Sequence, residues 1–214
     1  MKAWYFSDAT KKLQYNDGRD IAIDITHTVE GTPKCCRHGL HGSKNILDAL
    51  QCAPGNIIWR VELSGKMDRQ PDKISATSRT YLAGGVDILP IILAWSRRVA
   101  LDVAHLWDMP DIVRKFLETG DKEIANATVY AAYVIANTAN AANATYSAAN
   151  AANAAANAAN TANAAYAAYS AYVTARAAAN AAAYAAVNAA NAAAKKKYTR
   201  WLLQDINKAM EGTK

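Results

Sequence analysis

The sequence predicts an α+β head of about four strands and one short helix, followed by a mainly α-helical coil or bundle rich in alanine and asparagine. Strand-like segments separated by turn signals fill the first 83 residues. No glycine or proline occurs between Asp121 and Glu211, and from residue 125 to 194 the chain holds 38 alanines, 12 asparagines and 7 tyrosines. Because alanine loses no side-chain entropy on ordering, it is the best helix former. The second part of the chain is therefore expected to be helical.

We expect four parts along the chain. Residues 1–83 form the small α+β head, and residues 84–120 form connecting helices that follow the Gly84-Gly85 linker. Residues 121–194 form an Ala/Asn/Tyr-rich helical repeat region. Residues 195–214 form a basic amphipathic C-terminal helix with Trp201, Leu202, Ile206 and Met210 on its apolar stripe.

In the head, alternation of apolar and polar residues and the placing of turn residues predict the elements. Asn16-Asp17-Gly18 is a hairpin-type turn signal. Ser43 is a plausible N-cap for the short helix Asn45–Ala53, which Pro54-Gly55 stops. The expected strands are Lys2–Phe6, Ile21–Ile25, Ile57–Leu63 and Lys73–Leu82.

Further helices follow, each with its own start or stop signal. Asp87 can cap a helix that has Pro90 in its first turn, and Pro110 starts another helix that Gly120 closes. Asp121 is then expected to cap the Ala-rich run.

Asparagine and tyrosine recur in the run at steps of three or four residues. Asparagine is a poor helix former, so its regular spacing indicates a row that faces a constant partner. The mean step is near 3.3 from residue 126 to 172, which requires either a tight superhelix or a bundle whose neighbours share the row. The expected interface residues are Asn137, Asn140, Asn143, Tyr146, Asn150, Asn153, Asn157, Asn160, Asn163, Tyr166, Tyr169 and Tyr172.

Two other interpretations of the run stay open. It could be low-complexity sequence that is helical without a defined partner. It could also be an ice-binding helix, but such helices repeat threonine every 11 residues, whereas Thr128, Thr138, Thr145, Thr161 and Thr174 are irregularly spaced. Alanine seams bury little area each, so a lone helix of this kind is not a stable domain and a homo-oligomer is expected.

Charge and cysteine usage limit the partners and the compartment. The formal net charge is +6 and is concentrated in the last 20 residues, where Lys195, Lys196 and Lys197 are consecutive. We expect this tail to increase solubility and not to bind a specific nucleic acid. Three cysteines without a secretory signal indicate a cytoplasmic protein, and no stretch is long enough to span a membrane.

One cluster of residues could carry chemistry. Cys35, Cys36, His38 and His41 lie within seven residues. A zinc site would use these residue types, but adjacent cysteines rarely face one ion and no second pair follows. Cys36 with His41 could form a nucleophile and base, which needs a third orienting group. We therefore assign no catalytic residue, no metal ligand and no cofactor, and expect these cysteines and histidines to be structural.

Several segments resemble an N-terminal domain of unknown function found in phage and bacterial proteins. They are Met1-Lys2-Ala3-Trp4, Gly39-Leu40-His41, Asp48-Ala49-Leu50 with Ala53-Pro54-Gly55, Arg60-Val61-Glu62-Leu63-Ser64-Gly65 and Asp72-Lys73. In that family the domain often precedes a long Ala-rich tail, although relatives place Trp, Arg and Asp among the alanines. The resemblance marks Cys36, Gly39, Leu40 and His41 as the head motif and implies a phage or bacterial setting, in the host cytoplasm if phage-encoded. It supplies no activity.

Two functions follow as expectations. The first is a non-enzymatic assembly or protein-interaction protein that self-associates through the coil; the resemblance adds a virion-associated or anti-defence role and a host protein partner. The alternative is an enzyme or nucleotide-binding head on a helical scaffold. Gly39-Leu40-His41, the short helix and a strand ending in Val61-Glu62-Leu63 are similar to a fragment of ADP-ribosyltransferase-like folds, whose other elements are not recognisable in this sequence.

Overall fold

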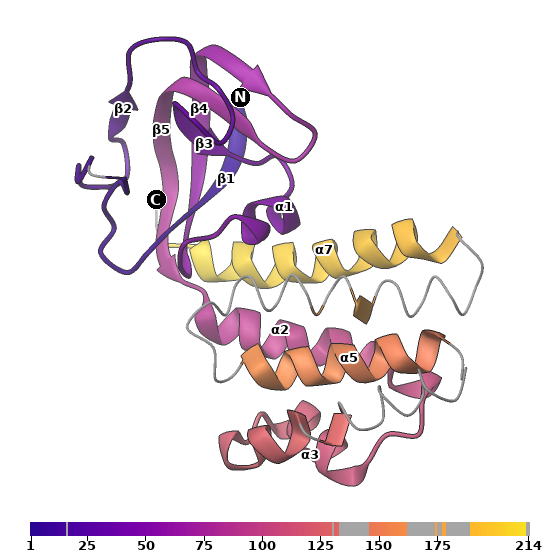
Figure 1. Ribbon diagram of the computed structural model, residues 1–214. Helices are drawn as coiled ribbons and strands as arrows, with labels where there is room; N and C mark the ends of the chain where they lie inside the picture. The colour runs from indigo at the N-terminus through magenta and orange to yellow at the C-terminus, as the bar shows by residue number, and fades with distance from the viewer. Residues whose placement is uncertain are drawn as a thin grey trace. The chain divides into compact units, whose positions relative to one another are not determined.

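The computed structural model describes residues 1–15, 17–129, 131–132, 146–161, 174, 177–178 and 189–212. The chain divides into two compact units. One, the head, contains Met1–Ile88 and the end of the chain from Asp205, and the other, the helical unit, is Leu89–Gln204. Figure 1 shows the sheet of the head and the helices of the helical unit.

The head contains an antiparallel sheet, which confirms the α+β class but has five strands instead of four. The strands are β1 (Lys2–Ser7), β2 (Thr26–Thr28), β3 (Leu40–Gly42), β4 (Ile57–Arg69) and β5 (Ile74–Asp87). Their order is β1-β4-β5-β2, and β3 also pairs with β5. The prediction of a strand at Ile21–Ile25 is wrong, because the chain turns there and the edge strand begins at Thr26.

Glycines inside the long β4–β5 hairpin allow the two strands to stay paired through irregular steps. Gly84 and Gly85 lie within β5 and not in a linker. A Cβ on Gly84 would be 2.4 Å from the Ile58 carbonyl oxygen, so only glycine permits this backbone approach. Gly65 has φ +76 and also lies within β4, so the strand continues past the residue where the sequence suggests its end.

One face of the sheet carries the core, which includes Ala3, Trp59, Val61, Leu63 and Tyr81. The segment between β1 and β2, residues 8–15 and 17–25, is called the strap; it adds its buried Leu13 and Ile21 to this core. The short helix α1 (Ile46–Gln51) contacts β1. Its N-cap is Asn45 and not Ser43, since the Asn45 side chain accepts a hydrogen bond from the Leu47 N–H.

The helical unit begins with α2 (Leu89–Asp102), η1 (Ala104–Leu106), α3 (Asp111–Thr119) and η2 (Lys122–Ile124). The predicted end of α3 at Gly120 is confirmed, and Asp121, which was expected to cap the Ala-rich run, caps η2 just before that run. Gly120 is the C-cap in the left-handed region at φ 73, and the Asp121 side chain accepts from the Glu123 N–H. The Ala-rich region contributes α5 (Tyr146–Thr161), and α7 (Ala189–Met210) begins in that region and continues through the basic segment.

Helix α2 contacts both α5 and α7. It packs on α5, while the Trp95 indole N–H donates to the Tyr198 carbonyl at 3.0 Å and the Tyr198 hydroxyl donates to Asp102 at 3.0 Å. Helices α5 and α7 thus both pack against α2 within the helical unit.

Candidate functional site

The predicted motif lies where β3 pairs with β5. Leu40 is opposite Ala76 and His41 is opposite Ser75. Gly39 precedes them at φ +106, and a Cβ there would be 2.3 Å from the Ser75 Oγ. Leu40 is buried in the core. Gly39 thus allows the close approach of its backbone to β5, and Leu40 packs in the core.

His41 holds the neighbouring turn together. Its Nε2 accepts a hydrogen bond from the Cys36 backbone N–H at 3.2 Å, and its carbonyl oxygen accepts from the Arg79 guanidinium at 2.7 Å. Burial lowers the pKa of His41, and the positive charges of Arg79 and Lys73 lower it further. The ring is therefore neutral at neutral pH, and its contact is to the backbone of Cys36 instead of to the thiol.

The turn from Lys34 to His38 presents Cys36 to solvent. Cys36 is exposed with φ 64, and its Sγ accepts from the Lys73 ammonium at 3.1 Å. This hydrogen bond is the main cause that raises the pKa of Lys73. Cys35 points the other way: its backbone N–H donates to Asp68 at 2.7 Å, and burial raises the pKa of its buried thiol. The two adjacent cysteines thus have different environments.

Arg79 on β5 is a buried cation held by neutral groups. It is 2% exposed. Its Nε and Nη2 donate to the Tyr81 Oη at 3.0 and 2.6 Å, and its Nη1 donates to the His41 carbonyl. Its guanidinium lies 3.7 Å from the centroid of the Tyr5 ring. Cation–π contact and charge-assisted hydrogen bonds therefore replace the carboxylate that a buried arginine usually has.

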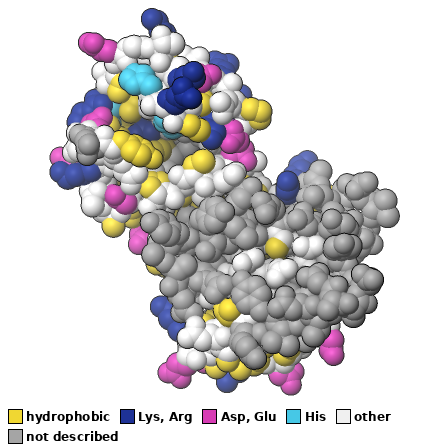
Figure 2. Space-filling view, viewed as in Figure 1, with side chains coloured by type: hydrophobic (Ala, Val, Ile, Leu, Met, Phe, Trp, Pro, Cys, Tyr) yellow, Lys and Arg dark blue, Asp and Glu magenta, His cyan; other side chains and the backbone are white. Residues whose placement is uncertain are grey.

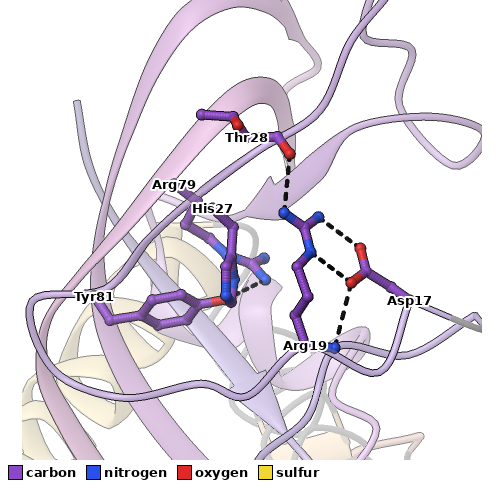
Figure 3. Close-up of polar contacts among 6 residues, drawn as sticks. All are labelled: Asp17, Arg19, His27, Thr28, Arg79 and Tyr81. Carbon is purple, nitrogen blue, oxygen red and sulfur yellow. Dashed lines mark hydrogen bonds and ion pairs between the residues drawn. The ribbon is translucent and has the colours of Figure 1, made fainter.

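His27 on β2 continues this buried polar cluster (Figure 3). Its Nδ1 is 3.3 Å from the Tyr81 Oη. Since that oxygen already accepts two N–H groups from Arg79, its own proton can point to His27. Burial lowers the pKa of His27, with Arg19 and Arg79 adding to the effect. Burial also raises the pKa of Tyr81 to about 12. Both groups are thus neutral at neutral pH.

Arg19 fastens the strap to the end of β2. It donates to both carboxylate oxygens of Asp17, at 2.6 and 2.7 Å, and to the Thr28 carbonyl at 3.0 Å (Figure 3). The pair is partly exposed, so its own contribution to stability is small. Its geometric effect is to hold the strap at the end of β2, beside His27 (Figure 3).

Only one half of this site was predicted from the sequence. The structure brings Cys36 and His41 together with Lys73 and Arg79. The roles of Arg79, Tyr81, His27 and Tyr5 were not predicted. Alternation along Lys73–Leu82 gave no signal for them, because Arg79 and Tyr81 share their row with Lys73, Ser75 and Thr77, which is the polar row of the segment. The irregular pairing of β4 with β5 turns Arg79 and Tyr81 toward the core.

The expected Asn/Tyr interface row is only partly within the described residues. In α5, Asn150, Asn153 and Asn157 are partly exposed, whereas the seven alanines between residues 151 and 159 are at most 1% exposed. For Tyr146 and Asn160 only the backbone is described. The remaining members, Asn137, Asn140, Asn143, Asn163, Tyr166, Tyr169 and Tyr172, lie outside the described residues.

The described part of the chain holds neither a metal-binding cluster nor a membrane-spanning helix. No group of three or more His, Cys, Asp or Glu residues is placed there to hold a metal ion. Among the same residues, no helix combines the length and the apolar character needed to cross a bilayer.

Comparison with known proteins finds a similarity to a family over the head. Residues 7–89 match a family model described as a domain of unknown function (DUF7666). The match ends at the first residue of α2 and leaves out the Ala-rich region. No curated protein and no solved structure matches the chain.

Proposed function

We propose that this chain is a non-enzymatic assembly protein that self-associates through the Asn/Tyr row of its Ala-rich region. The observation that carries the proposal is the division of α5 into two kinds of position. The seven alanines between residues 151 and 159 are buried within the chain, and Asn150, Asn153 and Asn157 form the partly exposed row. The alanines thus pack the helical unit itself and leave the asparagines at the surface.

An asparagine row suits contact between identical copies. Each amide has two N–H donors and an oxygen that can accept two hydrogen bonds, so Asn150 and Asn157, which already have a partner within the chain, keep capacity for a second copy related by two-fold symmetry. Residues 150, 153 and 157 are spaced by three and four, which places them on one side of the helix. Buried asparagines of this kind can fix the register and number of associating helices.

In this proposal the head is a protein-interaction module. The polar groups of its motif are engaged within the fold, since His41 binds the Cys36 backbone through its ring and Arg79 through its carbonyl. This use favours a rigid recognition surface over catalysis. The exposed turn around Cys36, beside Lys73, is the part of the motif that a partner protein can contact.

The proposed setting is the cytoplasm of a bacterium, or of a host cell if a phage encodes the chain. Its support is the resemblance of the head segments to a domain of phage and bacterial proteins that precedes Ala-rich tails. A host protein as partner, with a virion-associated or anti-defence role, is part of the same proposal.

The test removes the amides and keeps the helix. The variant N150A/N153A/N157A raises helix propensity at all three positions. We expect it to keep its helical circular dichroism and to lose its defined oligomeric mass in light scattering coupled to size-exclusion chromatography. The matched control is Q204A/N207A, which removes two amides from α7, outside the row.

A second control separates the coil from the head. C36A/H41A changes the head motif and should leave the oligomeric mass unchanged. A monomeric wild-type chain would rule out the proposal directly. A variant of unchanged mass and higher melting temperature would show that the Asn row is solvated and does not hold the assembly.

A further inference from the structure

Four basic residues form an exposed patch on α7, defined as Lys195, Lys196, Lys197 and Arg200. All four are exposed, whereas Ala194, Tyr198 and Leu202 of the same helix are buried. The helix therefore packs through one stripe and presents the basic residues to solvent. In Figure 2, Lys and Arg side chains stand on the edge of the helical unit that α7 occupies in Figure 1.

The composition of the chain leaves this patch largely uncompensated. No Asp or Glu occurs from Ile124 to Gln204. Lys197 forms an ion pair with Asp102 on α2. Within the part of the chain that the structure describes, Lys195, Lys196 and Arg200 have no ion pair. The patch thus offers three charges to an anionic partner.

The neighbouring aromatic ring indicates which part of a nucleic acid would be contacted. Arg98 lies 4.2 Å and Lys197 lies 4.9 Å from the centroid of the Trp201 ring. Base stacking needs a free aromatic face. Because cations already lie over this half-buried ring, the patch offers charge and no stacking platform.

We propose that the patch binds the phosphate backbone of duplex nucleic acid without sequence preference. The six residues from Lys195 to Arg200 rise about 7.5 Å along the helix axis. A duplex carries one negative charge per about 1.7 Å, or about four over that length. The three available charges of the patch therefore come close to the charge density of the duplex backbone.

A lipid surface fits these observations less well. A helix that lies in a membrane interface inserts its apolar face. The apolar stripe of α7 is buried within the chain. Among the described residues, the large hydrophobic side chains that are exposed are Tyr15 and Ile25, both in the head.

The experiment measures binding to a fluorescein-labelled duplex DNA of mixed sequence by fluorescence anisotropy. Neutralising three phosphates gives a slope of about −2.7 in log K against log salt, so affinity should fall about 20-fold from about 50 to about 150 mM NaCl. The variant K195Q/K196Q/R200Q should lose binding at the lower salt concentration. A second duplex of unrelated sequence should bind equally well.

The matched control, K2Q/K34Q/K66Q, removes three exposed lysines from the head and changes the net charge equally. It should bind as the wild type does. Equal loss in both variants, or no binding by the wild type at about 50 mM salt, would overturn the proposal. Binding to phosphatidylserine vesicles in place of DNA would also overturn it. The salt slope of the wild type tests it independently of any variant.

Discussion

At the scale of single residues, the head depends on how a buried guanidinium is satisfied without a carboxylate. Removing a charge from water is costly unless hydrogen bonds and attractive contacts replace the solvent. Arg79 obtains these from the Tyr81 hydroxyl, the His41 carbonyl and the Tyr5 ring. Each of these partners comes from a different strand, so Arg79 ties β1, β3 and β5 together.

The substitution Tyr81→Phe tests this arrangement. It removes the oxygen that accepts two N–H groups from Arg79 and leaves those donors buried. We expect the free energy of unfolding to fall by about 1–3 kcal/mol, the cost of an unsatisfied buried polar group. Urea unfolding measures the change. Tyr15→Phe is the control, because Tyr15 is 97% exposed and its hydroxyl should contribute nothing measurable; equal losses in both variants would contradict the assignment.

Acid should weaken the same cluster through His27. The pKa of His27 is lowered from 6.5 in the folded chain, so the unfolded chain binds more protons as the pH falls below that value. Stability is therefore fully present well above pH 6.5 and decreases as the pH falls through and below that value. Urea midpoints across this range measure the decrease.

The control for this pH dependence is His27→Asn. The asparagine Oδ1 can accept from the Tyr81 hydroxyl as Nδ1 does, but it does not titrate. The variant should show a shallower decrease, with the remaining slope coming from His41, whose pKa is also lowered. Parallel curves for wild type and variant would show that His27 does not control this pH range.

At the scale of elements, β3 is a strand that depends on pairing with a segment far away in the sequence, β5. It has three residues, Leu40–Gly42, and binds β5 along Ile74–Ala76. Such a short strand has little stability of its own. The close approach of Gly39 to Ser75 sets the point where the chain enters the sheet.

Gly39→Ala should therefore lower the free energy of unfolding more than the replacement of an unhindered glycine in the left-handed region does. At Gly39 the new Cβ would meet the Ser75 Oγ at 2.3 Å and the Ala76 carbonyl at 3.1 Å, in addition to the strain of φ +106. Gly18→Ala is the control, because Gly18 has φ +68 and nothing within 4 Å. We expect Gly39→Ala to lose about 1–3 kcal/mol more than the control in urea unfolding. Equal losses would show that β3 can shift freely.

At the scale of the whole molecule, the buried polar cluster and the packed alanines belong to different units of the chain. The head holds the buried cluster and nearly balanced charge. The helical unit packs alanines of α5 against α2 and α3, and side chains this small allow close helix approach. Since residues 124–194 carry one charge, Arg176, the other acids and bases of the helical unit lie at its two sequence ends.

Local signals in the sequence were sufficient for several features. The Gly120 C-cap and the Asp121 N-cap were predicted because each depends on neighbours within a few residues. The helical nature of α5 followed from alanine content and the lack of breakers. The β4–β5 hairpin was predicted in part, since alternation indicated strands at Ile57–Leu63 and Lys73–Leu82.

The sequence by itself determined the α+β class of the head, the helical character of α5 and α7 and the ends of α3, because these depend on contacts within a turn or on side-chain period. Tertiary structure decided the rest. His41 and its partner Ser75 are 34 positions apart, and the burial of Arg79 requires Tyr5 from the first strand. Such contacts depend on which strands become neighbours in the sheet, and strand pairing is set by the packing of the whole head, which no local pattern encodes.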